Sequence, residues 1–254
     1  MINAISSWIK DYALTHNRKS LVVGISGGID SAVVSTLCAK TKLPVYAVSM
    51  PIAQIESQHD LSIAHGEWLE EKFNNVKHDI IDLDKVYDEF WLKLFNEYDN
   101  KLAFANSKSR LRMVTLHQIS GSKKGIVVGT GNKVEDFGVG FYTKYGDGGV
   151  DISPIADLYK TEVWNLGKEL GILEDIINAE PTDGLWEDGR TDADQLHGLS
   201  YEKLEHAMKN GPDSEFYDKY QEIRKPNLHK MKEIPVFKNE FSTAQTSDSK
   251  GRSK

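Results

Sequence analysis

The chain has 254 residues, of which 39% are hydrophobic and 27% are charged, which suits one large α/β domain or two small ones. Its net charge of −7 argues against non-specific nucleic-acid binding, and a single cysteine, Cys38, excludes a disulfide framework and a cysteine-based zinc site within one chain. Because neither a signal-peptide core nor an apolar run of about 20 residues is visible, we expect a cytoplasmic protein that binds neither membrane nor nucleic acid.

The apolar pattern alternates between short β-branched runs and longer amphipathic stretches. In the first stretch, Ile2, Ile5, Ile9 and Tyr12 recur at helical spacing. Strands are predicted at residues 20–25, 44–50, 75–83 and 125–132. Helices are predicted at residues 2–13, 31–41, 56–73, 84–98, 108–121, 161–172, 200–211 and 213–225. This alternation predicts an α/β fold with a doubly wound, mostly parallel sheet and helices on both faces.

Polar, glycine-bearing segments at 141–160 and 181–195 are predicted loops. We expect residues 1–241 to form a single domain, and residues 242–254, which have almost no apolar side chain, to form a flexible tail. Ligands of open parallel sheets bind beyond the carboxyl ends of the strands. The two strands that end in glycines, 20–25 and 125–132, should therefore contribute to one site.

The segment GISGGIDS, residues 24–31, joins a predicted strand to a predicted helix. The backbone N–H groups of such a turn, together with the helix N-terminus, bind anions. The segment has neither the lysine of a nucleoside-triphosphatase P-loop nor the dinucleotide fingerprint. An acid beside phosphate needs an intervening cation, so we interpret Asp30 as a Mg²⁺ ligand; the alternative is that it caps the following helix. The phosphate donors would be Ser26, Gly27, Gly28 and Ser31.

SGGIDS directly after a strand resembles the pyrophosphate loop of the N-type ATP pyrophosphatases, whose fold is the adenine nucleotide alpha-hydrolase-like form of the α/β sheet. Members of that family cleave ATP to AMP and pyrophosphate. The resemblance implies that ATP is a co-substrate held by the whole loop, by Gly24, Ile25, Ser26, Gly27, Gly28, Ile29, Asp30 and Ser31. The loop does not identify the acceptor, because amide-forming synthetases, tRNA thiolases and argininosuccinate synthetase share it.

Four later segments narrow the choice of acceptor substrate. They are NSKSRLRM (106–113), GTGNKVE (129–135), TKYGDGGVDISPIADLYK (143–160) and NLHKMKEIPV (227–236). With the loop they resemble the NAD synthetase family over nearly the whole chain apart from the polar tail. The resemblance implies a homodimer that uses Mg²⁺ and converts deamido-NAD, ATP and ammonia to NAD, AMP and pyrophosphate. Adenylation removes the charge of the acceptor carboxylate and supplies AMP as a leaving group, so that ammonia can attack.

The same resemblance implies roles for individual residues. Glu135 would be the second Mg²⁺ ligand, with Asp30. Asp147 is the candidate for holding ammonium and accepting its proton, and Lys160 for supplying the positive charge that the loop lacks. Read alone, Glu135 also fits a solvated helix start, Lys160 a surface lysine and Asp147 a turn residue. The other implied ATP contacts are Thr130 and Thr182, besides Lys160. The implied deamido-NAD contacts are Arg110, Lys144, Asp151, His229 and Lys230.

In the predicted helix 108–121, Lys108 and Arg112 are four residues apart and share a face, while Arg110 projects elsewhere. Arg112 fits a structural ion-pair partner equally well and receives no role. The chain departs from the family pattern at Ser109, where alanine is frequent. It departs again at PTDGL (181–185), where the family has a T-A-D-L-like loop.

Some relatives make ammonia in a glutaminase domain with a cysteine nucleophile. The nitrogen donor here is expected to be free ammonia, because Cys38 falls on the apolar side of its predicted helix, where a buried thiol is a small hydrophobe and not a nucleophile. Two alternative functions remain. A tRNA-modifying thiolase would usually need a basic surface and paired cysteines, which this chain lacks. A non-catalytic nucleotide sensor would not need both Asp30 and Glu135.

Overall fold

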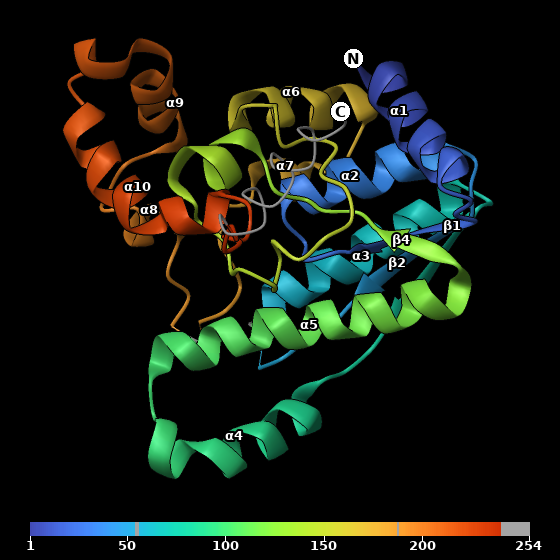
Figure 1. Ribbon diagram of the computed structural model, residues 1–254. Coiled ribbons are helices and arrows are strands. Elements are labelled where there is room, and N and C mark those ends of the chain that lie inside the picture. The colour runs from blue at the N-terminus through green and yellow to red at the C-terminus, as the bar shows by residue number, and fades with distance from the viewer. Residues whose placement is uncertain (54–55, 187, 240–254) are drawn as a thin grey trace, which may run out of the picture.

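The computed structural model describes residues 1–53, 56–186 and 188–239. Its centre is a parallel four-stranded sheet in the order β3-β2-β1-β4 (Figure 1). In this register Val22 of β1 lies beside Tyr46 of β2 and Val127 of β4. The strands are β1 Ser20–Gly24, β2 Val45–Ser49, β3 Val76–Ile80 and β4 Gly125–Val127.

Helices cover both faces of this sheet, which confirms the predicted fold class. Alternate side chains of β1 point to opposite sides: Leu21 and Val23 pack with α1, α2, α3 and α6, whereas Val22 packs with α4 and α5. The helices are α1 Ile2–Thr15, α2 Ile29–Lys40, α3 Glu56–Lys72, α4 Asp84–Tyr98, α5 Lys101–Lys123, α6 Lys160–Leu170, α7 Glu174–Asn178, α8 Asp192–Gln195, α9 Tyr201–Asn210 and α10 Tyr217–Met231.

A third apolar cluster lies beyond the sheet and joins α9 and α10 to the π-helix η1, Val134–Val139. Val134, Val139 and Leu204 are fully buried in it. A short 3₁₀ turn, η2 (Gly211–Asp213), connects α9 to α10. This cluster holds α9 over the segment that follows β4, so residues far apart in the sequence meet there.

Several predicted boundaries are wrong. The helix predicted from residue 108 begins at Lys101, because the Asn100 side chain accepts the Ala103 N–H at 2.9 Å and caps it. The helix predicted to end at Lys225 continues through Pro226 to Met231. The strand predicted at 125–132 ends at Val127, and α7, α8 and η1 were not predicted.

The predicted tail, 242–254, lies outside the described residues, as do residues 240–241 at the end of the predicted domain, so both expectations stay predictions. Within the described part of the chain, no helix is both long and apolar enough to cross a membrane.

Candidate active site

The glycine loop leaves β1 and enters α2 at the carboxyl edge of the sheet. Gly27 has a φ of 87°, in the left-handed region that favours glycine. Ser31 fixes the turn, because its Oγ accepts the Ser26 N–H at 3.1 Å and donates to the Gly28 carbonyl at 2.9 Å. A Cβ on Gly24 would lie 3.3 Å from the Met50 side chain, so this position is tight as well.

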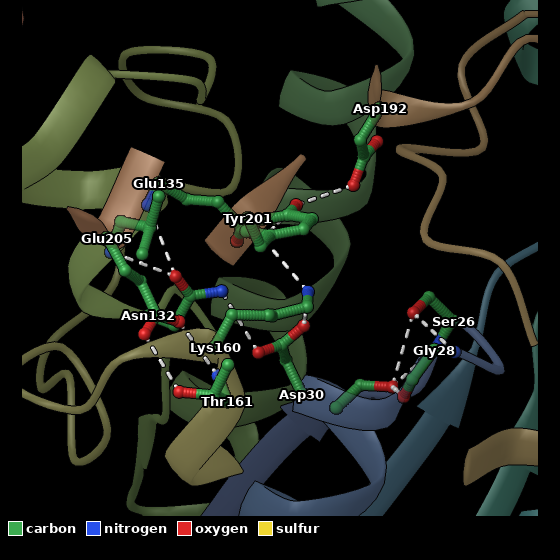
Figure 2. A network of polar contacts seen from close by, with 12 residues as sticks. Ser26, Gly28, Asp30, Asn132, Glu135, Lys160, Thr161, Asp192, Tyr201 and Glu205 are labelled. Atoms are coloured by element: carbon green, nitrogen blue, oxygen red, sulfur yellow. Dashed lines mark hydrogen bonds and ion pairs between the residues drawn. The ribbon is translucent and has the colours of Figure 1, made fainter. Parts of the chain in front are cut away.

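An ion-paired lysine joins the loop to the later segments (Figure 2). The Asp30 carboxylate, in the first turn of α2, accepts hydrogen bonds from the Lys160 ammonium and from Asn132 Nδ2, the latter at 3.1 Å. Lys160 Nζ also lies 3.0 Å from Glu135 Oε1. Burial opposes the charged form of Lys160, but Asp30 and Glu135 outweigh it and raise the lysine pKa. Asp30 is therefore not a helix cap, and Lys160, 3% exposed, is not a surface lysine.

Two residues that the sequence did not suggest complete this network. Tyr201 Oη lies 2.6 Å from Glu135 Oε1 and 2.7 Å from Asp192 Oδ2. A phenol has one hydrogen, so both contacts can be hydrogen bonds only if one carboxyl group is protonated. Burial, and then the charge of Glu135, raise the pKa of Asp192 to about 7, so Asp192 can carry the proton of this pair near neutral pH.

The first turn of α6 is tied to α9, the helix that carries Tyr201. The buried Glu205 carboxylate accepts the Thr161 N–H at 3.0 Å and the Thr161 hydroxyl at 2.8 Å. Thr161 follows Lys160 directly, so this pair fixes the lysine relative to Tyr201. No sequence signal marks Tyr201 or Asp192, whereas Asn132 could have been found as the polar end of the GTGN segment.

Asp147 belongs to the same site. Its Oδ1 accepts hydrogen bonds from Ser109 Oγ at 2.7 Å and from the Thr143 N–H at 2.9 Å, and its own N–H donates to Ser109 Oγ at 2.9 Å. Burial raises the Asp147 pKa, and these hydrogen bonds oppose that shift. Ser109, the position where the family often has alanine, is thus a partner of Asp147.

Asp30, Glu135, Asp147, Lys160 and Asp192 line one cavity of about 350 Å³, whereas Asn132, Thr161, Tyr201 and Glu205 support it from behind. Its lining includes all eight residues of the glycine loop (24–31), together with Thr130, Glu135, Asp147, Lys160 and Thr182. The Thr182 hydroxyl donates to the Arg190 carbonyl at 3.2 Å and accepts the Gly184 N–H at 3.3 Å. These two bonds shape the PTDGL segment, residues 181–185.

Acidic side chains outnumber basic ones in the cavity wall. Burial, followed by the charges of Glu135, Asp147 and Asp30, raises the pKa of the neighbouring Asp136 to about 8. Such crowding favours a cation in the cavity. The acids are Asp30, Glu135, Asp136, Asp147, Glu180, Asp183 and Asp192, and the bases are Arg112 and Lys160.

The five predicted deamido-NAD contacts do not line this cavity. Arg110 is exposed and donates through Nε to the Lys144 carbonyl at 3.2 Å. Asp151 accepts the Val127 N–H at 2.7 Å, which anchors its segment to β4. Lys230 donates to the Tyr142 carbonyl at 2.7 Å, and His229 is exposed on α10.

Cys38 is fully buried within α2, and burial raises the pKa of its thiol. A thiol in this position packs as a small apolar side chain. The expectation that it is no nucleophile agrees with its position.

The chain matches the NAD synthase family over residues 1–245. It belongs to the NAD synthase family. An NH(3)-dependent NAD(+) synthetase of Carboxydothermus hydrogenoformans is 37% identical over 238 residues, which cover 91% of this chain and 94% of the relative. The predicted family and enzyme class are confirmed, ATP is a substrate of this family, and the thiolase and sensor alternatives are not favoured.

Solved structures of this fold agree with the assignment to the NAD synthase family. The structure of an NMN synthetase from Francisella tularensis superposes with a TM-score of 0.85 at 30% identity and covers 92% of this chain and 96% of its own. An NH3-dependent NAD synthetase from Campylobacter jejuni superposes with a TM-score of 0.73 at 26% identity and covers 93% and 97%.

Proposed function

We propose that this NAD synthase family member amidates deamido-NAD with ammonia, coupled to cleavage of ATP to AMP and pyrophosphate. The observation that carries the proposal is the buried contact of Lys160 with Asp30 and Glu135 beside the glycine loop. It combines a cation, two carboxylates and a phosphate-binding turn at the carboxyl edge of a parallel sheet, where nucleotides bind.

Mg²⁺ fits this donor set. Asp30 and Glu135 already face one shared cation, the Lys160 ammonium, so they are arranged around a single positive charge. Within the described residues no group of three or more His, Cys, Asp or Glu side chains could hold a metal. Mg²⁺ uses one or two carboxylates together with phosphate oxygens, so two ligands are enough. When bound, the ion would neutralise phosphate charge.

The chain's own residues would divide the remaining work. The loop N–H groups and Lys160 would hold the phosphates of ATP, with Thr130 and Thr182 at the cavity wall. Asp147, buried and fixed by Ser109 and Thr143, would attract ammonium and accept its proton as the adenylated carboxyl group is attacked.

The outer residues Arg110, Lys144, Asp151, His229 and Lys230 would hold the distal part of deamido-NAD at the cavity rim. We also propose a cytoplasmic homodimer. Four apolar side chains on α4 are 38% to 53% exposed, and a second copy of the chain that covered them would remove this apolar surface from water. They are Val86, Phe90, Trp91 and Leu92.

A second candidate acceptor is the acid precursor of NMN, a mononucleotide. The likeness to the NMN synthetase of Francisella tularensis favours it, and so does a cavity whose lining excludes the five predicted dinucleotide contacts. The test is to incubate the enzyme with ATP, Mg²⁺ and ammonium and to compare kcat/KM for deamido-NAD and nicotinic acid mononucleotide. A preference for deamido-NAD supports the first proposal and the reverse supports the second. No pyrophosphate with either acceptor would contradict both.

A further inference from the structure

Arg112, to which the sequence gave no role, has an unusual place in the cavity wall. It lies on the face of α5 that lines the cavity, whereas Arg110 on the same helix is exposed. Of its five N–H donors only Nε has a partner among the described residues, the Met50 carbonyl at 3.0 Å. Burial lowers the pKa of Arg112 to about 10, so the guanidinium stays charged at neutral pH.

The charges of three carboxylates, Asp183, Asp147 and Asp84, partly offset the lowering of the Arg112 pKa, but each of these groups has other hydrogen-bond partners. Asp84 accepts the Ala53 N–H at 2.6 Å, and Asp183 accepts the Leu185 N–H at 3.0 Å. Asp147 is held by Ser109 and Thr143, as described above. In the part of the chain that the structure describes, none of the three forms an ion pair with Arg112, so the structural ion-pair interpretation does not hold. A largely buried guanidinium that forms no direct ion pair and has unused N–H donors costs stability, and a ligand that pairs with it would offset that cost.

The other cation of the cavity is already neutralised. Lys160 contacts both Asp30 and Glu135, which leaves Arg112 as the cavity-lining base with no acidic partner among the described residues. The cavity must nevertheless receive nucleotides that carry several negative charges. A planar guanidinium with free N–H groups matches two oxygens of a phosphate at once.

We propose that Arg112 binds a phosphate group of a nucleotide substrate in this cavity. The proposal rests on the proposed function for the identity of the nucleotides. The phosphate belongs either to ATP or to the acceptor nucleotide. The Met50 carbonyl orients the guanidinium, and the Met50 side chain packs beside Gly24 at the start of the glycine loop. Arg112 therefore lines the same cavity as the loop that would bind ATP, and the acceptor nucleotide would enter that cavity too.

The experiment compares ligands that differ only in phosphate. Binding of ATP and adenosine, and of nicotinic acid mononucleotide and nicotinic acid riboside, is measured by calorimetry for the wild type, Arg112→Gln and Arg112→Lys. Loss of a charged hydrogen bond should weaken binding of at least one nucleotide by about 10- to 100-fold in Arg112→Gln. Its dephosphorylated partner should bind as before, and Arg112→Lys should lose less. Lys168→Gln, which removes an exposed charge from α6, should change nothing.

The outcomes separate the possible sources and roles. Weaker binding of ATP alone assigns the phosphate to ATP, and weaker binding of the mononucleotide alone assigns it to the acceptor. Unchanged binding of both nucleotides, or equal losses for nucleotide and nucleoside, would overturn the proposal and leave a structural role at Met50. If Arg112→Gln does not fold, Arg112→Lys decides by the same comparison. A wild type that binds ATP but forms neither NAD nor NMN would contradict the proposed function and not this inference.

Discussion

Replacing Tyr201 by phenylalanine should separate the stabilising role of its hydroxyl from that of its ring. The hydroxyl contacts Glu135 Oε1 and Asp192 Oδ2, and Asp192 Oδ1 is buried with no hydrogen-bond partner among the described residues. The variant would therefore leave both Asp192 oxygens unsatisfied. The ring would keep its edge contact with Trp164, at 6.0 Å between centroids, and its place 4.6 Å from Lys160 Nζ.

A hydrogen bond to a charged group contributes about 1.5–3 kcal/mol, so we expect Tyr201→Phe to lower the free energy of unfolding by about 2–3 kcal/mol. For a chain of this size that corresponds to a fall in Tm of roughly 4–12 °C. Urea and thermal unfolding, followed by circular dichroism, measure both quantities. Tyr217→Phe is the matched control, since the Tyr217 hydroxyl has no hydrogen bond in the described structure, and it should change stability by less than about 0.5 kcal/mol.

The protonation state of Asp192 gives a second readout of the same network. Asparagine at this position can donate to Tyr201 Oη as the protonated acid does, whereas alanine cannot. Asp192→Asn should thus retain most of the stability, and Asp192→Ala should lose about as much as Tyr201→Phe. A Tyr201→Phe enzyme with wild-type stability, or an asparagine variant as unstable as the alanine variant, would refute the shared-proton arrangement.

Three further predictions concern the loop, the proposed base and a buried histidine. Asp30→Asn and Glu135→Gln should each reduce kcat far more than they weaken acceptor binding, and equal losses in both would argue against metal ligation. Ser109→Ala removes a donor to Asp147, so the acid limb of the kcat/KM profile for ammonium should move up by as much as about one pH unit; an unmoved limb would contradict Asp147 as the base. Burial, then His78, lowers the pKa of His65 from 6.5 to about 4. The unfolded chain therefore binds the extra proton between these values, and stability should fall as pH drops from 6.5 to 4, by about 3 kcal/mol more than in His65→Gln in urea titrations.

The sequence predicted the parts of this molecule that local patterns encode. The β-branched run at 20–25 and the glycine turn after it have the geometry expected of a strand followed by a phosphate-binding loop. Because parallel strands end at one edge, the meeting of Asp30 and Glu135, which are far apart in the sequence, could also be anticipated. The helical spacing predicted that Lys108 and Arg112 share a face that Arg110 does not, and in the structure Lys108 is buried, Arg112 half-buried and Arg110 exposed.

Other features depend on contacts that no local pattern encodes. Tyr201 opens an amphipathic helix whose apolar spacing gives it the appearance of an ordinary core residue, and only the packing of α9 on η1 brings it to Glu135. Pro226 signals a helix end, yet α10 continues to Met231, and Asn227 Nδ2 in this last part donates to the Ile223 carbonyl and to the Val139 carbonyl, both at 3.0 Å. In both cases the structure adds a contact between segments far apart in the sequence, which no local signal encodes.

The negative charge of the cavity wall determines what must enter the cavity together with the nucleotides. Two nucleotides bring several negative charges into a wall where acids outnumber bases, so nucleotide binding requires cations or protons to enter as well. Asp192 and Asp136, with pKa values of about 7 and 8, take up protons within the wall itself. Lys160 is held by Asp30 and Glu135, the two carboxylates that would hold the proposed Mg²⁺. A second positive charge at these carboxylates would leave the charge of Lys160 available for phosphate. An acidic cavity thus makes the proposed Mg²⁺ and ammonium part of nucleotide binding itself, and among the lining residues that the structure describes Arg112 supplies a positive charge that is not paired with a carboxylate.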